Sequence, residues 1–243
     1  MAKINLDDYL KLSKNSVFKE KLVNYKFFFE VKLASARQQN DIRIYVPEID
    51  KDGYDVVLDD GDNIKPFQLK ATNNSSKTSK WEVQKNLLRP NPLNCELLGY
   101  EQSPEGEGTE GGFILVSIVV TADDIERFDY YYTDAYIIKA FELGLLRYNN
   151  KTYEEKIKQL IAQLHSGSRR EKVILNKSKL VKVKSVDNLL ALSNVPSITH
   201  NQWQLSFRNF IKNKNTNSTI TNERQEIVSL LKELIDDKRI IIS

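Results

Sequence analysis

Three side chains that could together hydrolyse a phosphate ester lie within residues 48–71, EIDKDGYDVVLDDGDNIKPFQLKA. Asp55 offers a carboxylate, Gln68 an amide oxygen and Lys70 an ammonium group. Carboxylate and carbonyl oxygens are ligands that Mg²⁺ prefers, and the ion keeps water and substrate phosphate in its shell. We therefore expect Asp55 and Gln68 to bind Mg²⁺, with Mn²⁺ as a substitute. Lys70 would position the attacking water and offset phosphate charge.

Whether these side chains meet depends on how the two strands that carry them pair. Residues 54–59 and 66–71 are rich in apolar, β-branched and aromatic side chains and are bounded by glycine, which predicts two strands. A two-residue turn at positions 61–62 pairs Asp55 directly with Gln68 on one face of the hairpin. Moving the turn back by one residue makes Gln68 a diagonal neighbour on that face, whereas a loop of odd length separates the two.

A second carboxylate would strengthen a magnesium site, and the first helix offers one. Residues 17–36 contain no Gly or Pro and repeat apolar side chains at spacings of three and four, which predicts a helix. The apolar stripe that we expect to face the core consists of Phe18, Leu22, Tyr25, Phe29, Leu33 and Ala36. Glu30 lies at the border of this stripe, so we expect it to be an auxiliary metal ligand, with Glu20 as the competing position.

The remaining pattern is that of an α/β protein with a mixed sheet. The continuous apolar run 113–120 is typical of a strand covered on both faces, and residues 42–46 and 172–184 have strand character. In the aromatic run 128–136 we favour packing in the core over stacking on bases. Further helices are expected at 81–88, from 123–124 onward, and at 133–143, 151–164, 200–212 and 221–237.

The helix glutamate, the strand GYDVVL and the strand QLK together resemble the PD-(D/E)xK nuclease superfamily, most closely its Mrr-like branch with a D…QxK motif. The resemblance covers residues 17–145. It assigns Asp55 to the acidic position, Gln68 and Lys70 to QxK, and Glu30 to the helix position. It implies a restriction-endonuclease-like core, a mixed sheet flanked by helices, that cleaves DNA with magnesium. Two features depart from the family pattern: the proline before the acid is absent, and the neutral glutamine removes one negative charge.

Charge divides the chain into an acidic front and a basic back. Residues 1–150 carry a net charge of −5 and residues 151–243 one of +8. We expect a nuclease core over residues 1–148 and a basic, mainly helical extension over residues 149–243. The basic residues predicted to contact DNA phosphates are Lys77, Lys80, Lys85, Arg89, Arg169, Arg170, Lys179, Lys182 and Lys184.

Composition excludes several other classes of site. The single cysteine, Cys95, allows no disulfide within the chain and no thiolate zinc cluster, and two histidines leave little for a histidine metal site. No apolar run is long enough to span a bilayer, so we expect a cytoplasmic protein without a membrane partner. The acidic run from Asp50 lacks the glycine and glutamate spacing of an EF-hand calcium loop.

The function predicted from these residues is magnesium-dependent endonuclease activity on double-stranded DNA, in restriction or a related defence role, by a monomer or a homodimer. Two alternatives stay open. One is a nucleic-acid-binding or assembly module that retains the nuclease fold without catalysis. The other is a nuclease for RNA or branched DNA.

Overall fold

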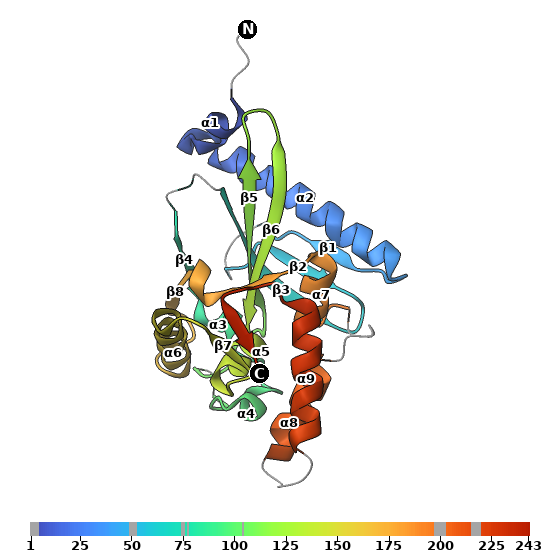
Figure 1. The fold of residues 1–243 in the computed structure, drawn as a ribbon, viewed down its shortest axis with the longest axis vertical. Helices are drawn as coiled ribbons and strands as arrows, with labels where there is room; N and C mark the ends of the chain where they lie inside the picture. The colour runs from blue at the N-terminus through green and yellow to red at the C-terminus, as the bar shows by residue number, and fades with distance from the viewer. Residues whose placement is uncertain are drawn as a thin grey trace.

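The computed structural model describes residues 5–48, 53–73, 76, 78–103, 105–196, 203–214 and 220–243. Its centre is a mixed sheet of six strands, flanked by helices (Figure 1). The strands in spatial order are β1 Arg43–Tyr45, β2 Val56–Asp59, β3 Ile64–Asn73, β5 Gly112–Val120, β6 Ile125–Asp134 and β9 Val181–Val183. Strand β3 runs parallel to β5, whereas the other neighbours are antiparallel. The predicted α/β class with a mixed sheet is confirmed.

Two small antiparallel sheets and the helices complete the fold. Strand β4, Lys80–Gln84, pairs with β8, Lys172–Asn176, and β7, Leu146–Tyr148, pairs with β10, Ile240–Ile242. The α-helices are α1 Leu6–Lys11, α2 Ser16–Arg37, α3 Lys85–Leu88, α4 Cys95–Leu98, α5 Ala135–Glu142, α6 Lys151–His165, α7 Val186–Ser193, α8 Trp203–Lys214 and α9 Ile220–Leu234. Two short 3-10 helices are η1 Ser13–Asn15 and η2 Lys177–Lys179.

Both faces of the central sheet are covered, and successive side chains along each strand point to opposite faces. Helix α2 covers one, because the ring of Phe27 contacts Tyr130, and Tyr130 lies in the same row across the strands as Ala71 of β3. Strand β4 covers the other, because the ring of Trp81 contacts Phe113, which lies in the row of Gln68. We call these the α2 face and the β4 face.

Helix α2 forms where the sequence predicts it, but with the opposite face inward. The side chains that enter the core are Val23, Phe27, Val31 and Ala34. In the predicted stripe, Tyr25 and Phe29 are 68 % and 61 % exposed, so that prediction is wrong. Both sets have helical spacing, and periodicity alone does not choose between them. The residues that face the sheet are mostly smaller than those of the exposed stripe, which lets the helix pack closely against the strands.

The first half of the helix expected at 81–88 and the helix expected from 123–124 are strands, because partners distant in sequence complete their hydrogen bonds, whereas residues 85–88 form the expected helix as α3. Residues 80–84 form β4, in which Trp81 and Val83 are buried and Lys80 and Glu82 are exposed, and β8 supplies the ladder. Residues 125–134 form β6, which pairs along its length with β5. The helix expected from residue 133 begins after Asp134, whose carboxylate accepts the Ile137 amide as the N-cap. The tyrosines of β6 at positions 130–132 are buried, as predicted.

Strands from both sides of the predicted boundary at residue 148 pair with one another. Beyond it lie β8, β9 and β10 as well as four helices, and these strands pair with β4, β6 and β7. In the part of the chain that the structure describes, the acidic front and the basic back therefore share one sheet system and one core.

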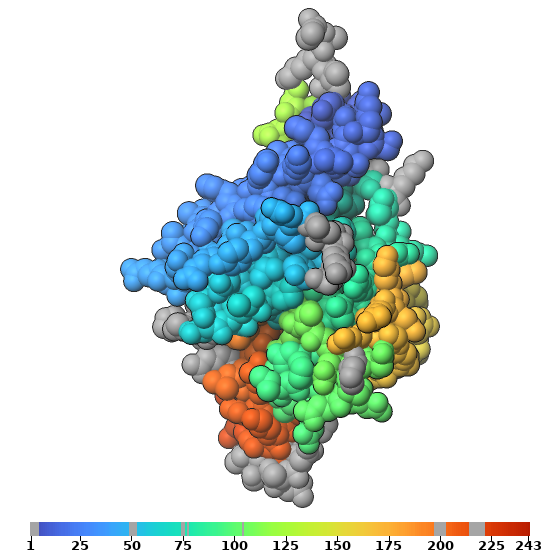
Figure 2. Space-filling model, turned by 180° about the vertical axis from the view of Figure 1, so that it is seen from behind, coloured from blue at the N-terminus to red at the C-terminus, as the bar shows by residue number. Residues whose placement is uncertain are grey.

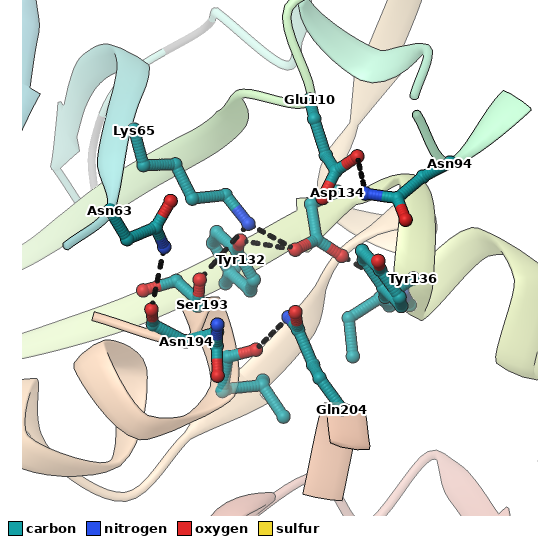
Figure 3. A network of polar contacts seen from close by, with 12 residues as sticks. Asn63, Lys65, Asn94, Glu110, Tyr132, Asp134, Tyr136, Ser193, Asn194 and Gln204 are labelled. Atoms are coloured by element: carbon teal, nitrogen blue, oxygen red, sulfur yellow. Dashed lines mark hydrogen bonds and ion pairs between the residues drawn. The ribbon is translucent and has the colours of Figure 1, made fainter. Parts of the chain in front are cut away.

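A buried polar network also joins the two parts (Figure 3). The Lys65 ammonium of β3 donates to Asp134 Oδ2 at 2.9 Å and to the Ser193 carbonyl of α7 at 3.0 Å. The Tyr132 hydroxyl donates to the same Asp134 oxygen at 2.6 Å. Burial, together with the Asp134 carboxylate, raises the pKa of Tyr132 well above its ordinary value, so this hydroxyl stays a donor. The network fixes α7 to the sheet.

Candidate active site

The hairpin that carries the candidate site has the first of the two registers that a two-residue turn allows. Val56 lies opposite Phe67, and the amide of Asp60 donates to the Asn63 carbonyl at 3.2 Å, so positions 61–62 form the turn. This register places Asp55, just before β2, beside Gln68. The predicted two-residue turn is confirmed.

Asp55 and Lys70 form an ion pair on the β4 face. The Lys70 ammonium lies 3.3 Å from Asp55 Oδ2, and their side chains are 28 % and 19 % exposed, respectively. The same carboxylate oxygen accepts the backbone amide of Leu69 at 2.7 Å. Both contacts use Oδ2 and neither uses Oδ1. The backbone of β3 thus fixes the orientation of the carboxylate, while the pair stays accessible to solvent.

Gln68 supplies the most informative atom of the site. Its residue is 8 % exposed, and among the described residues no hydrogen-bond partner reaches Oε1. A buried polar atom without a partner costs about 1–3 kcal/mol. Seven buried side-chain atoms of the described residues lack a partner, and among them Gln68 Oε1 is distinguished by its place beside Asp55 and Lys70, where a ligand could complete it.

Gln84, at the end of β4, is a neighbour of the site that the sequence analysis missed. Gly53 has a φ of +76°, and a Cβ atom there would lie 2.9 Å from the side-chain Cγ and Cδ of Gln84. The Gln84 side chain therefore lies against the backbone two residues before Asp55. The only signal in the sequence is the glycine in GYDVVL, which permits this close approach.

Glu30 is separated from the other predicted ligands by the sheet. It accepts the hydroxyl of Tyr130, and its other oxygen lies 2.9 Å from the Lys26 ammonium. Tyr130 shares its row with Ala71, and the neighbouring Lys70 points to the opposite face. Glu30 thus belongs to the α2 face and does not join Asp55, which corrects the prediction that it is an auxiliary ligand.

The four basic residues that follow the QLK strand and were predicted to contact DNA lie in different environments. Lys77 lies outside the described residues, and Lys80 is exposed at the start of β4. Lys85 is 4 % exposed and contacts Glu171 at 2.5 Å and the Ser166 carbonyl at 2.9 Å.

Arg89 is 1 % exposed and donates to the carbonyls of Leu164, Glu105, Ser166 and Gly167. Lys85 and Arg89 therefore hold loops together and cannot reach a phosphate in this conformation, contrary to the prediction.

The basic tract of the C-terminal half is also divided. Lys179 lies in η2 instead of a strand, is 8 % exposed, and donates to the Ile174 carbonyl at 2.7 Å, so the prediction that it contacts DNA does not fit its burial. Lys182 lies on the β4 face and pairs with Asp129 at 3.1 Å. Lys184 is exposed and donates to the Lys232 carbonyl at 3.0 Å. Arg169 and Arg170 lie in a surface turn.

Lys177 is a further cation on the β4 face that the sequence analysis did not select. Its ammonium lies 3.4 Å from Ser117 Oγ and 4.2 Å from the centre of the Tyr131 ring. Tyr131 lies in the row of Lys70, two strands away. Burial, with the nearby cations Arg239 and Lys182, lowers the pKa of Lys177, which an approaching anion would restore.

The donor set fits a loosely held magnesium ion. Asp55 and Gln68 offer oxygen atoms that Mg²⁺ accepts, and the unpartnered Oε1 is a neutral ligand of this kind. Within the described ranges, no group of three or more His, Cys, Asp or Glu side chains is placed to hold a metal ion. Water and substrate phosphate would therefore complete the shell, as they commonly do for Mg²⁺.

Comparison with protein-family models finds no match, and comparisons with curated proteins and with solved structures likewise find none. None of the helices in the described part of the chain is long and apolar enough to cross a membrane.

Proposed function

We propose that the chain is a magnesium-dependent nuclease that hydrolyses phosphodiester bonds of double-stranded DNA at the Asp55–Gln68–Lys70 site. The observation that carries the proposal is the buried Gln68 Oε1, which has no partner among the described residues, next to a partly exposed lysine–aspartate pair on the same sheet face. A carboxylate and an amide oxygen could hold a divalent ion whose remaining ligands are water and substrate phosphate, and the ammonium group could contact the same phosphate.

Each residue has a separate part in the proposed reaction. Asp55 and Gln68 would hold magnesium, which when bound neutralises phosphate charge and acidifies a coordinated water. The Leu69 amide keeps the Asp55 carboxylate oriented. Lys70, with three donor hydrogens and one bond to Asp55, can hold the attacking water and offset the charge of the transition state.

The choice of DNA as substrate rests on the cations of the same face. Lys182 lies on the β4 face in the row of Lys70, three strands from β3, and Lys177 lies over the ring of Tyr131, which is in the same row two strands from β3. Adjacent strands are about 4.8 Å apart, so this row of cations is roughly 14 Å long, which spans more than one backbone phosphate. Lysine contacts of this kind position a duplex without reading its sequence.

A binding module without catalysis is the second candidate, and the separation of Glu30 from Asp55 favours it. Incubation of supercoiled plasmid with the purified chain and Mg²⁺ or Mn²⁺ distinguishes the two. We expect nicking that the Lys70→Ala and Asp55→Asn variants lose and that the exposed turn variant Asp62→Asn retains. Equal nicking by all four proteins, or DNA binding without cleavage under either metal, would contradict the proposal. Cleavage of RNA or branched DNA alone would correct the substrate.

A further inference from the structure

The outer surface of α2 carries a row of large apolar side chains that the fold leaves uncovered. Figure 2 shows this helix as a continuous blue band across one side of the molecule. The exposed members are Val17 at 61 %, Phe18 at 51 %, Tyr25 at 68 %, Phe29 at 61 % and Leu33 at 38 %. Leu22 and Phe28 lie between them and are half-buried. We call this set the α2 stripe.

The α2 stripe contributes little to the stability of a single chain. Helix α2 is already fixed on its other side, where Val23, Phe27 and Val31 are fully buried. Phe18 contacts only the edge of the Tyr9 ring, at 5.6 Å, among the aromatic contacts of the described residues. Contiguous exposed apolar surface on one element is typical of an interface.

We propose that the α2 stripe is the interface of a homodimer in which the helices α2 of two copies pack antiparallel, with the two-fold axis beside Tyr25. In such an interface each residue meets the residue equally far on the other side of the axis. Tyr25 would then meet Tyr25 of the second copy. Phe18 would meet the aliphatic stem of Lys32, and Leu22 would pack beside Phe29 or Phe28.

The distribution of charge favours this occupant and this direction. Two lysines, Lys21 and Lys32, lie on the helix surface among the residues of the α2 stripe, and no acidic residue lies there. In a parallel pair each lysine would face the same lysine of the second chain, and the two like charges would repel each other. In the antiparallel pair Lys21 faces Phe29 and Lys32 faces Phe18, and a cation against an aromatic ring is a favourable contact.

The size of the surface predicts a dimer of modest affinity. Helix α2 has 22 residues, which corresponds to about 33 Å of length. One pair of helices of this length buries less area than the roughly 800 Å² per partner of standard stable interfaces. We therefore expect a dimer that forms at micromolar or higher protein concentration. The inference does not depend on the proposed nuclease activity.

A disulfide across the axis tests the geometry directly. The only native thiol, Cys95, is fully buried, so an introduced cysteine reacts alone. We expect Tyr25→Cys in the full chain to form a covalent dimer under mild oxidation at least ten times faster than Leu93→Cys, a control at a 91 % exposed position. Equal rates for the two variants would overturn the proposal.

Sedimentation equilibrium supplies the second measurement. We expect the native chain to be a concentration-dependent dimer and Phe29→Glu to be a monomer. The matched control Leu205→Glu, at a 51 % exposed position on α8, should remain a dimer. A native chain that stays monomeric into the hundreds of micromolar would overturn the proposal. Monomer binding to anionic phosphatidylserine vesicles that Phe29→Glu abolishes would then assign the stripe to a lipid surface.

Discussion

Two lysine–aspartate pairs start from the same strand, β3, and lie on opposite faces of the sheet. Lys65 and Asp134 are 2.9 Å apart, with side chains only 5 % and 0 % exposed. Lys70 and Asp55 are 3.3 Å apart and keep 28 % and 19 % of their side-chain surface. The first pair is enclosed by a tyrosine hydroxyl, a helix N-terminus and a carbonyl of α7. The second adjoins the buried amide oxygen of Gln68, which has no hydrogen-bond partner in the part of the chain that the structure describes.

The difference shows how the same two residue types serve structure on one face and suit chemistry on the other. Lys65 and Asp134 bond to neighbouring groups of the chain and are almost completely buried, which is the environment of a structural ion pair. Around Lys70 and Asp55, the described residues leave Asp55 Oδ1 and the Gln68 amide oxygen open to a ligand. Residue type and spacing do not distinguish the two pairs; burial and the completeness of their hydrogen bonds do.

The largest loss of stability is expected from breaking the buried Lys65–Asp134 pair. Asp134→Ala leaves the Lys65 ammonium buried without its counter-ion and removes the N-cap of α5. Removing one partner of a buried ion pair costs about 3–5 kcal/mol. Urea unfolding should show a loss of this size, and a loss below about 1 kcal/mol would mean that the pair is not structural.

Breaking the partly exposed Lys70–Asp55 pair should instead cause a large loss of activity and only a small loss of stability. Asp55→Asn keeps an oxygen for the Leu69 amide but removes the charge that would bind metal. Partly exposed ion pairs contribute at most about 1 kcal/mol, so unfolding should change by no more than that. Cleavage should fall at least about 100-fold, as for loss of one electrostatic contact to a transition state. Unchanged cleavage with intact folding would remove Asp55 from the site.

Removing Lys177 and Lys182 from the β4 face should have a smaller effect, a change in how DNA affinity depends on salt. Each phosphate contact adds about 0.9 to the slope of log affinity against log salt. We expect Lys177→Ala combined with Lys182→Ala to flatten this slope by about 1.8, measured on uncleaved duplex in the Asp55→Asn background. Lys179→Met, at a buried position, is the matched control and should leave the slope unchanged. An unaltered slope in the double variant would place the duplex elsewhere.

The smallest expected effect is that of replacing Gln68, which should not lower the stability of the fold. Gln68→Met removes a buried acceptor that lacks a partner, so the free energy of unfolding should stay the same or rise by about 1 kcal/mol. Magnesium affinity should fall at the same time, as measured by calorimetric titration. A clear destabilisation would indicate that Oε1 is satisfied in solution.

Gln68→Glu is the complementary variant. A second carboxylate beside Asp55 should preserve or raise magnesium affinity, and a ligand that binds only the folded chain raises its stability. We therefore expect the melting temperature of Gln68→Glu to rise with added Mg²⁺ more than that of the native chain. The same rise in both proteins would argue against a metal ligand at this position.

Local patterns in the sequence determined the hairpin and its contents. Alternation, a two-residue turn signal and the positions of Asp55, Gln68 and Lys70 are properties of neighbouring residues. They predicted the shared face for either two-residue turn, and the structure selects the register with the turn at 61–62. The apolar run at 113–120 likewise predicted the central strand β5, because a strand covered on both faces needs no polar alternation.

Tertiary structure decided what depends on distant partners. Helix α2 has two apolar faces of helical spacing, and only packing against the sheet buries the one with Phe27 and carries Glu30 to the face opposite Asp55. Lys85 and Arg89 resemble surface cations in sequence, yet carbonyl oxygens of the last turn of α6 and of the residues that follow it accept their hydrogen bonds. Burial and hydrogen-bond satisfaction are set by segments far apart in the chain, and periodicity within one segment cannot encode them.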